Sequence, residues 1–132
     1  MLQLRDLPTK ETLKKFAMRY PQADISAISA FLHLLRVATD LSLALDECLS
    51  HHGLLQGRWW VLILLMREEN LTATPSMLAS KAGVTRATMT GLIDGLERDG
   101  LVTRVMDIQD RRSISIKLTE AGQARLDDVM PD

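Results

Sequence analysis

Residues 74–100 read TPSMLASKAGVTRATMTGLIDGLERDG, and this stretch decides the fold. Thr74 followed by Pro75 is typical of a helix start, because threonine caps the first turn and proline suits the first helical position. Gly83 ends that short helix, and apolar residues spaced i, i+3, i+4 and i+7 predict a second helix over residues 86–98. A short helix, a tight turn and a second helix with a small, polar outer face form the helix-turn-helix arrangement.

The outer face of the second helix carries residue types that suit a DNA groove. Once the apolar side turns inward, Thr85, Arg86, Thr88 and Thr90 remain outside, near the start of the helix. Threonine hydroxyls can bond phosphates or bases, and an arginine can contact guanine or phosphate. Any pair of packed helices in a small helical protein shows the same pattern, so the following segment has to decide between the two interpretations.

That segment predicts a β-hairpin. Two short β-prone runs, residues 101–106 and 113–118, flank the polar loop DIQDRR at residues 107–112. An arginine on a β loop suits a narrow, electronegative minor groove, whereas the alternative is a solvated charged turn. The hairpin favours a winged helix-turn-helix over a plain helical pair. The candidate DNA-binding residues of the loop are Gln109, Arg111 and Arg112.

The rest of the chain is predicted to be helical. Thr9 is expected to cap a helix over residues 10–19, and Asp24 to cap a long helix that runs to about residue 50. Further signals predict a helix over residues 56–69 and a last helix that begins at Thr119. The long helix carries two sets of apolar residues, which cover more of its circumference than one core-facing stripe requires. It is either the central helix of one larger core or, as we favour in so short a chain, a helix that packs on a second protomer.

Several motifs together resemble the MarR family. They lie in residues 78–85, 89–94, 96–102, 107–112 and 117–122, and the resemblance covers about residues 54–122. It is most specific in the wing, where the family favours an Asp-x-Arg-Asp-x-Arg loop followed by Leu-Thr-x-x-Gly. Gln109 stands where an arginine is common, so one wing contact is expected to differ.

The resemblance implies a mainly α fold with a small β-hairpin wing, and a homodimer held by N- and C-terminal helices. Residues 1–53 would be the N-terminal arm and dimerisation helix, residues 54–118 the DNA-binding lobe, and residues 119–132 the start of a C-terminal dimerisation helix. Two recognition helices would enter successive major grooves of a pseudo-palindromic operator in double-stranded DNA. The expected function is a transcription regulator, in particular a repressor released by a small lipophilic or phenolic ligand.

Such regulators often hold a small aromatic ligand between the dimerisation helices and the DNA-binding lobe. A pocket of this kind needs apolar walls and a few hydrogen-bond donors. The alternative is that the tryptophans are ordinary core residues and the histidines lie on the surface. The candidate pocket residues are His33, Arg36, His52, Trp59 and Trp60.

Cys48 suggests a second alternative, a redox-sensing regulator, although its place near the end of the long helix favours an inert cysteine. Cys48 and His52 share one helix face, but histidines also suit a helix C-terminus, and we expect no metal and no cofactor. The chain holds no nucleophile elbow, glycine-rich phosphate loop or HExxH motif, so an enzyme is not expected.

Composition and charge further limit the class of protein and its location. The chain has 132 residues, of which 46% are hydrophobic, and its longest apolar run, residues 59–66, is shorter than the roughly 18 residues that suggest a membrane span. Residues 1–15 show no signal-peptide pattern, so a cytoplasmic protein is expected. The net charge of −1 does not indicate DNA binding, but residues 76–118 carry seven cationic and five anionic side chains. A winged-helix adaptor without DNA binding is the alternative, against which Arg111 and Arg112 argue.

Overall fold

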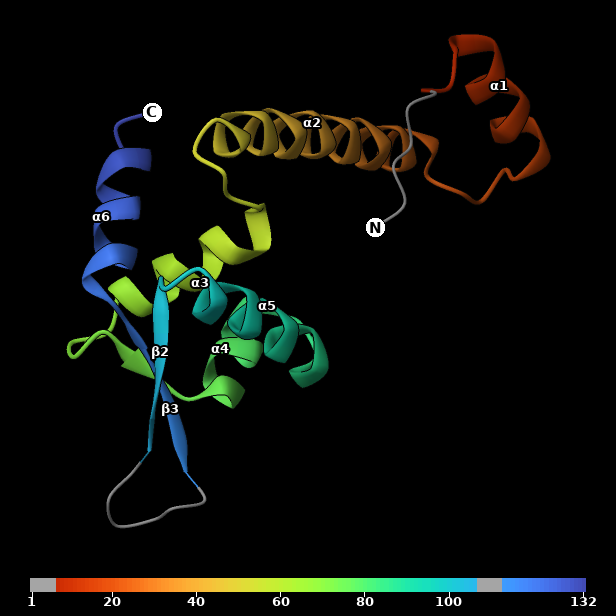
Figure 1. Ribbon diagram of the computed structural model, residues 1–132. Helices are drawn as coiled ribbons and strands as arrows, with labels where there is room; N and C mark the ends of the chain where they lie inside the picture. The colour runs from red at the N-terminus through yellow and green to blue at the C-terminus, as the bar shows by residue number, and fades with distance from the viewer. Residues whose placement is uncertain (1–6, 107–112) are drawn as a thin grey trace. The chain divides into compact units, whose positions relative to one another are not determined.

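A computed structural model describes residues 7–106 and 113–132. The chain separates into two compact units, residues 1–45 and 46–132, and we describe each by itself (Figure 1). The wing-loop residues Gln109, Arg111 and Arg112 lie outside the described residues.

The N-terminal unit consists of helix α1 and most of helix α2. α1 spans Lys10–Arg19, and Thr9 caps it by accepting a hydrogen bond from the Thr12 backbone N–H at 3.2 Å. α2 spans Ile25–Ser50 and begins after Asp24, whose carboxylate accepts from the Ala27 N–H at 3.0 Å. Both helix starts agree with the capping residues that the sequence indicates.

Helix α2 leaves much of its apolar surface uncovered. Side chains that would normally be buried are exposed along it, and Leu34 and Leu41 are 67% and 66% exposed. By length and composition alone α2 is long and apolar enough to cross a membrane, since an 18-residue window reaches a mean hydropathy of 1.5. Of that window, 6% is buried. Exposed apolar surface of this kind is typical of a protein–protein or membrane interaction site. The other large apolar side chains exposed on α2 are Ile28, Phe31, Val37 and Leu43.

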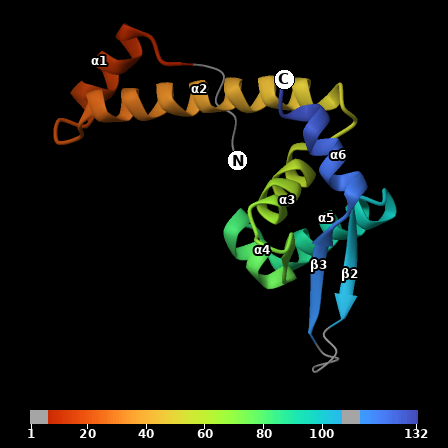
Figure 2. The ribbon, with the colours of Figure 1, turned by 90° about the vertical axis from the view of Figure 1, so that its left-hand side faces the viewer.

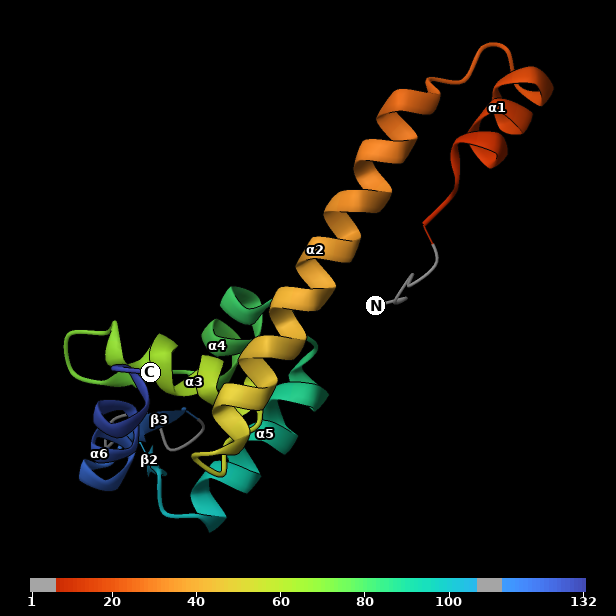
Figure 3. The same ribbon diagram turned by 90° about the horizontal axis from the view of Figure 1, so that it is seen from above.

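The second unit is a lobe of four helices and a small sheet. Figures 1 and 2 show three of its helices beside a β-hairpin that extends away from them, and in Figure 3 the strands are seen nearly end-on beneath the fourth helix, α6. In chain order its elements are α3 (Gln56–Met66), β1 (Thr72–Ala73), α4 (Pro75–Ala82), α5 (Arg86–Arg98), β2 (Val102–Met106), β3 (Ile114–Leu118) and α6 (Glu120–Val129).

The sheet is antiparallel, with the strand order β1-β3-β2. The hairpin expected from the sequence is present, with Arg104 opposite Ile116 and Val102 opposite Leu118. The sequence did not predict β1, which pairs Ala73 with Ile116 on the other edge of β3. The wing sheet therefore has three strands in place of two.

The core of the lobe lies where α3, α4 and α5 meet the sheet and α6. α3 is its most apolar helix, as predicted, but it ends at Met66 and not at residue 69. The mainly α architecture with a small antiparallel wing is confirmed. The largest fully buried side chains of the lobe are Leu49, Val61, Leu62, Leu65, Leu78, Met89, Ile93, Leu96, Val102, Ile116, Leu118 and Leu126.

Candidate nucleic-acid interface

The turn between α4 and α5 is built by capping groups. Thr74 caps α4 by accepting from the Met77 N–H at 3.2 Å, with Pro75 in the first helical position. Gly83 ends α4 in the left-handed conformation, at φ 70°, which glycine adopts without the steric cost that a side chain brings. The Val84 N–H then donates to the Ala79 carbonyl at 3.1 Å. The helix-turn-helix expected from residues 74–100 is therefore present.

Helix α5 packs against helix α3 at two glycines, Gly57 of α3 and Gly95 of α5. Met89, Ile93 and Leu96 are buried, so one side of α5 faces the core. A methyl group at Gly95 would overlap the guanidinium of Arg58 on α3, and one at Gly57 would lie 3.1 Å from Leu92 Cδ2. At each of these glycines a side chain of one helix therefore lies against the backbone of the other, and this packing orients the outer side of α5.

The threonine hydroxyls at the start of α5 are already engaged within the helix. Thr85 is the N-cap: its Oγ1 accepts from the Thr88 N–H at 3.1 Å and donates to Thr88 Oγ1 at 3.0 Å. Thr90 Oγ1 donates to the Arg86 carbonyl at 2.9 Å. A hydroxyl has one proton and two lone pairs, so Thr88 keeps a donor for an outside partner, whereas Thr85 and Thr90 keep acceptors. All four predicted positions on this helix are exposed.

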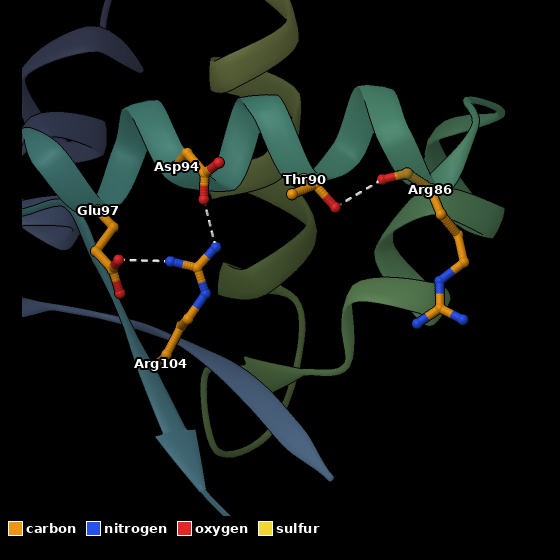
Figure 4. Close-up of polar contacts among 5 residues, drawn as sticks. All are labelled: Arg86, Thr90, Asp94, Glu97 and Arg104. Carbon is orange, nitrogen blue, oxygen red and sulfur yellow. Dashed lines mark hydrogen bonds and ion pairs between the residues drawn. The ribbon is translucent and has the colours of Figure 1, made fainter. Parts of the chain in front are cut away.

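An ion cluster joins the far half of α5 to the wing (Figure 4). Arg104 on β2 donates through Nη2 to Asp94 Oδ1 and through Nη1 to Glu97 Oε1, each at 2.5 Å. The hydrogen bond to Asp94 raises the pKa of Arg104 above its usual range, although burial acts in the opposite direction. The sequence interpretation missed Arg104, since nothing in a strand pattern tells which helix carboxylates the side chain will meet.

The predicted ligand-pocket residues are divided between the two units. In the N-terminal unit, His33 Nδ1 lies 2.8 Å from the Ser29 carbonyl, and Arg36 pairs with Asp40 at 3.3 Å. The two units are not placed relative to one another, so the structure does not bring these residues together with the other three.

In the lobe, the rings of Trp59 and Trp60 are in contact, with centroids 4.8 Å apart. Trp60 donates to Gln56 at 3.4 Å, whereas the buried Nε1 of Trp59 has no hydrogen-bond partner among the described residues. His52 Nε2 lies 2.7 Å from an Asp132 carboxylate oxygen. The ligand pocket stays a prediction.

An apolar cavity of about 540 Å³ lies between α1 and the start of α2, lined by Leu13, Phe16, Tyr20, Ile28 and Leu32 among others. In residues 7–106 and 113–132, no group of three or more His, Cys, Asp or Glu side chains is placed to hold a metal ion.

Comparison with known proteins identifies relatives along nearly the whole chain. The sequence profile of the MarR family matches residues 52–113. The HTH-type transcriptional repressor YetL of Bacillus subtilis (strain 168) is 35% identical over 130 residues, which are 98% of this chain and 78% of YetL. These relatives are transcription regulators and not enzymes.

Solved structures of MarR-type regulators share the fold. The regulator MosR of M. tuberculosis, solved in complex with DNA, is 32% identical with a TM-score of 0.63, over 77% of this chain and 72% of that one. CouR of Rhodococcus jostii RHA1, solved with p-coumaroyl-CoA bound, is 30% identical with a TM-score of 0.71, over 83% of this chain and 75% of that one.

Proposed function

This chain belongs to the MarR family of DNA-binding transcription regulators, and from that premise we propose that it is a homodimeric repressor whose α5 helix reads the major groove of a pseudo-palindromic operator. The observation that supports the proposal most strongly is the exposed start of α5, where Arg86 and three threonines stand on a helix that packs against α3. Side chains of this size allow a recognition helix to lie deep in a groove.

The DNA contacts are assigned residue by residue. Thr85, Arg86, Thr88 and Thr90 are proposed to reach base edges or the nearest phosphates. Gln109, Arg111 and Arg112 are proposed to contact the minor groove or its phosphates, because they belong to the loop between the two wing strands.

The dimer is proposed to form through the helices that flank the DNA-binding region. Residues 1–53 and 119–132 would supply the interface, and residues 54–118 would bind DNA. The apolar surface of α2 supports this assignment, because a second copy would cover side chains such as Leu34 and Leu41 that one chain leaves exposed. Covered in this way, α2 needs no membrane, and we place the regulator in the cytoplasm.

Operator binding is tested with fluorescence anisotropy. The duplex from upstream of the protein's own gene is expected to bind at least about a thousandfold more tightly than a scrambled duplex, with affinity falling steeply as salt rises. Arg112→Ala is expected to weaken binding at least about tenfold and to reduce the slope of log K against log salt by about 1, because one phosphate or groove contact is lost. Equal binding of both duplexes by the unmodified protein would contradict the proposal.

Release by a small aromatic ligand is proposed on two grounds: CouR was solved with p-coumaroyl-CoA, and Trp59 holds an unpartnered N–H among the described residues. The proposed pocket residues are His33, Arg36, His52, Trp59 and Trp60. A panel of phenolic acids and their thioesters is expected to include a compound that raises the unfolding temperature and also displaces the operator, because a ligand that binds the folded state stabilises it. A panel in which no compound changes either quantity would remove the ligand from the proposal.

A further inference from the structure

The outer side of α5 carries uncharged and cationic residues in its first half and two carboxylates, Asp94 and Glu97, in its second half. Arg86, Thr90 and Asp94 follow one another at intervals of four residues, and Glu97 comes three residues later, so all four lie along one side of the helix. Figure 4 shows them in this order along α5. We call these four residues the outer row of α5.

Two unpaired carboxylates in the outer row would oppose DNA binding. The side chains of Asp94 and Glu97 are 52% and 42% exposed, so they lie on the surface. If the first half of the row enters a groove, the second half approaches the phosphates that border it, and like charges repel there. A recognition helix with this sequence needs a cation beside these two positions.

Arg104 supplies that cation from a different element. It stands on β2 opposite Ile116, and its guanidinium reaches both carboxylates with separate nitrogen atoms. A planar guanidinium can bridge two acceptors in this way, whereas lysine carries its charge at a single point. Its side chain is 33% exposed, which places it at the surface between helix and wing.

We propose that Arg104 is a positioning residue for DNA binding: it neutralises Asp94 and Glu97 and so allows the outer row of α5 to approach the phosphate backbone. The inference rests on the proposed function and adds to it a residue outside both the recognition helix and the wing loop. Arg104 acts through the two carboxylates and not through its own contact with DNA.

The test measures anisotropy of a duplex selected by the protein from a random pool. Arg104→Gln is expected to weaken binding at least about tenfold at low salt, because two carboxylates then face the phosphates uncompensated. The triple variant with Asp94→Asn and Glu97→Gln added is expected to return to within about threefold of the original affinity, with the original salt slope. If Arg104→Gln alone does not fold, Arg104→Gln with Asp94→Asn takes its place: it leaves Glu97 uncompensated and is expected to bind more weakly than the triple variant, and equal binding of the two would contradict the proposal.

A charge-matched control separates local neutralisation from a general gain of positive charge. Asp127 and Asp128 are exposed on α6, and their change to asparagine alters the net charge by the same amount. Because α6 belongs to the proposed dimer interface, sedimentation velocity first establishes that this control variant has the oligomeric state of the original protein. The variant that combines Arg104→Gln with Asp127→Asn and Asp128→Asn is expected to bind at least about tenfold more weakly than the original protein. Equal rescue by the control would overturn the proposal.

Two other outcomes also count against it. A triple variant that stays weak, with the salt slope reduced by about 1, would show that Arg104 contacts a phosphate itself. An Arg104→Gln protein that binds as tightly as the original would show that the carboxylates do not face DNA. If the unmodified protein selects no duplex over a scrambled one, the proposed function fails, which is a result distinct from both.

Discussion

Replacing Gly122 by alanine is expected to lower the free energy of unfolding by about 3 kcal/mol, at the upper end of what overpacking of a rigid site usually costs. Gly122 is buried in the first turn of α6, and a methyl group there would overlap the backbone carbonyl oxygen of Leu101. A backbone atom cannot rotate away as the end of a side chain can. The strain must therefore displace α6 or the start of β2.

Hydrogen bonds hold the start of α6 to the segment before β2, so neither can shift easily to relieve the overlap. Thr119 caps α6 by accepting from the Gly122 N–H at 3.0 Å, and its Oγ1 donates to the Gly100 carbonyl at 2.7 Å. The Thr119 N–H donates to the Leu101 carbonyl at 3.1 Å. The Leu-Thr-x-x-Gly segment thus has a physical reason for its glycine as well as for its threonine.

Urea unfolding followed by circular dichroism measures the effect, with Gly91→Ala as the matched control. Gly91 is also a helical glycine, but it is exposed and a methyl group there would meet nothing within 4 Å. Alanine at that position is expected to raise the free energy of unfolding by up to about 1 kcal/mol, through helix propensity. Two variants with equal stability would show that the contact with Leu101 imposes no constraint.

The double variant Leu34→Arg/Leu41→Arg is expected to be monomeric and to lose operator affinity by a factor of at least about 100. Both side chains are about two-thirds exposed and stand seven residues apart, on one side of α2. In a dimer interface the two arginines would be buried without partners, which costs several kcal/mol. A monomer then binds each half-site separately and loses the gain that comes from linking two sites.

Sedimentation velocity and operator anisotropy on the same samples provide the measurement. Glu47→Arg changes the net charge by the same amount on the same helix, and it lies on a different side, since six residues rotate the position by about 240°. This control is expected to remain dimeric and to bind the operator. Added positive charge favours DNA binding, so a loss in the double variant cannot come from charge alone. A double variant that stays dimeric would place the interface elsewhere.

The sequence predicted the helix-turn-helix correctly because its boundaries are local. Thr74, Gly83 and Thr85 act within one or two turns of the helices that they begin or end, so their effect can be seen in the sequence without any tertiary contact. Strand β1 was missed for the opposite reason. It has two residues and exists through its pairing with β3, more than 40 residues later. Leu71 before it has a φ of 55°, unusual for leucine, and its carbonyl accepts from the Leu118 N–H at 2.9 Å.

For the candidate site, too, the sequence predicted only what depends on residues close together in the chain. The exposed positions of α5 follow from helical periodicity, as the burial of Met89 and Ile93 confirms. The cluster around Arg104 could not be predicted, because it depends on how strand β2 is placed against α5. The roles of Arg111 and Arg112 stay predictions that the operator experiment tests.

The hydroxyl of Thr85 has a consequence for how relatives of this protein diverge. Thr85 Oγ1 is both the cap of α5 and a proposed DNA contact. A substitution of Thr85 that altered base recognition would therefore also weaken the start of α5. Mutations with two such effects are rarely accepted, whereas Arg86 and Thr88, which are proposed to bind DNA through their side-chain donors, do not cap α5 through a side-chain oxygen. New binding preferences are therefore expected to evolve at Arg86 and Thr88, while the residue at position 85 is replaced chiefly by serine, aspartate or asparagine. Deep mutational scanning of these three positions against two operator sequences would reveal that asymmetry.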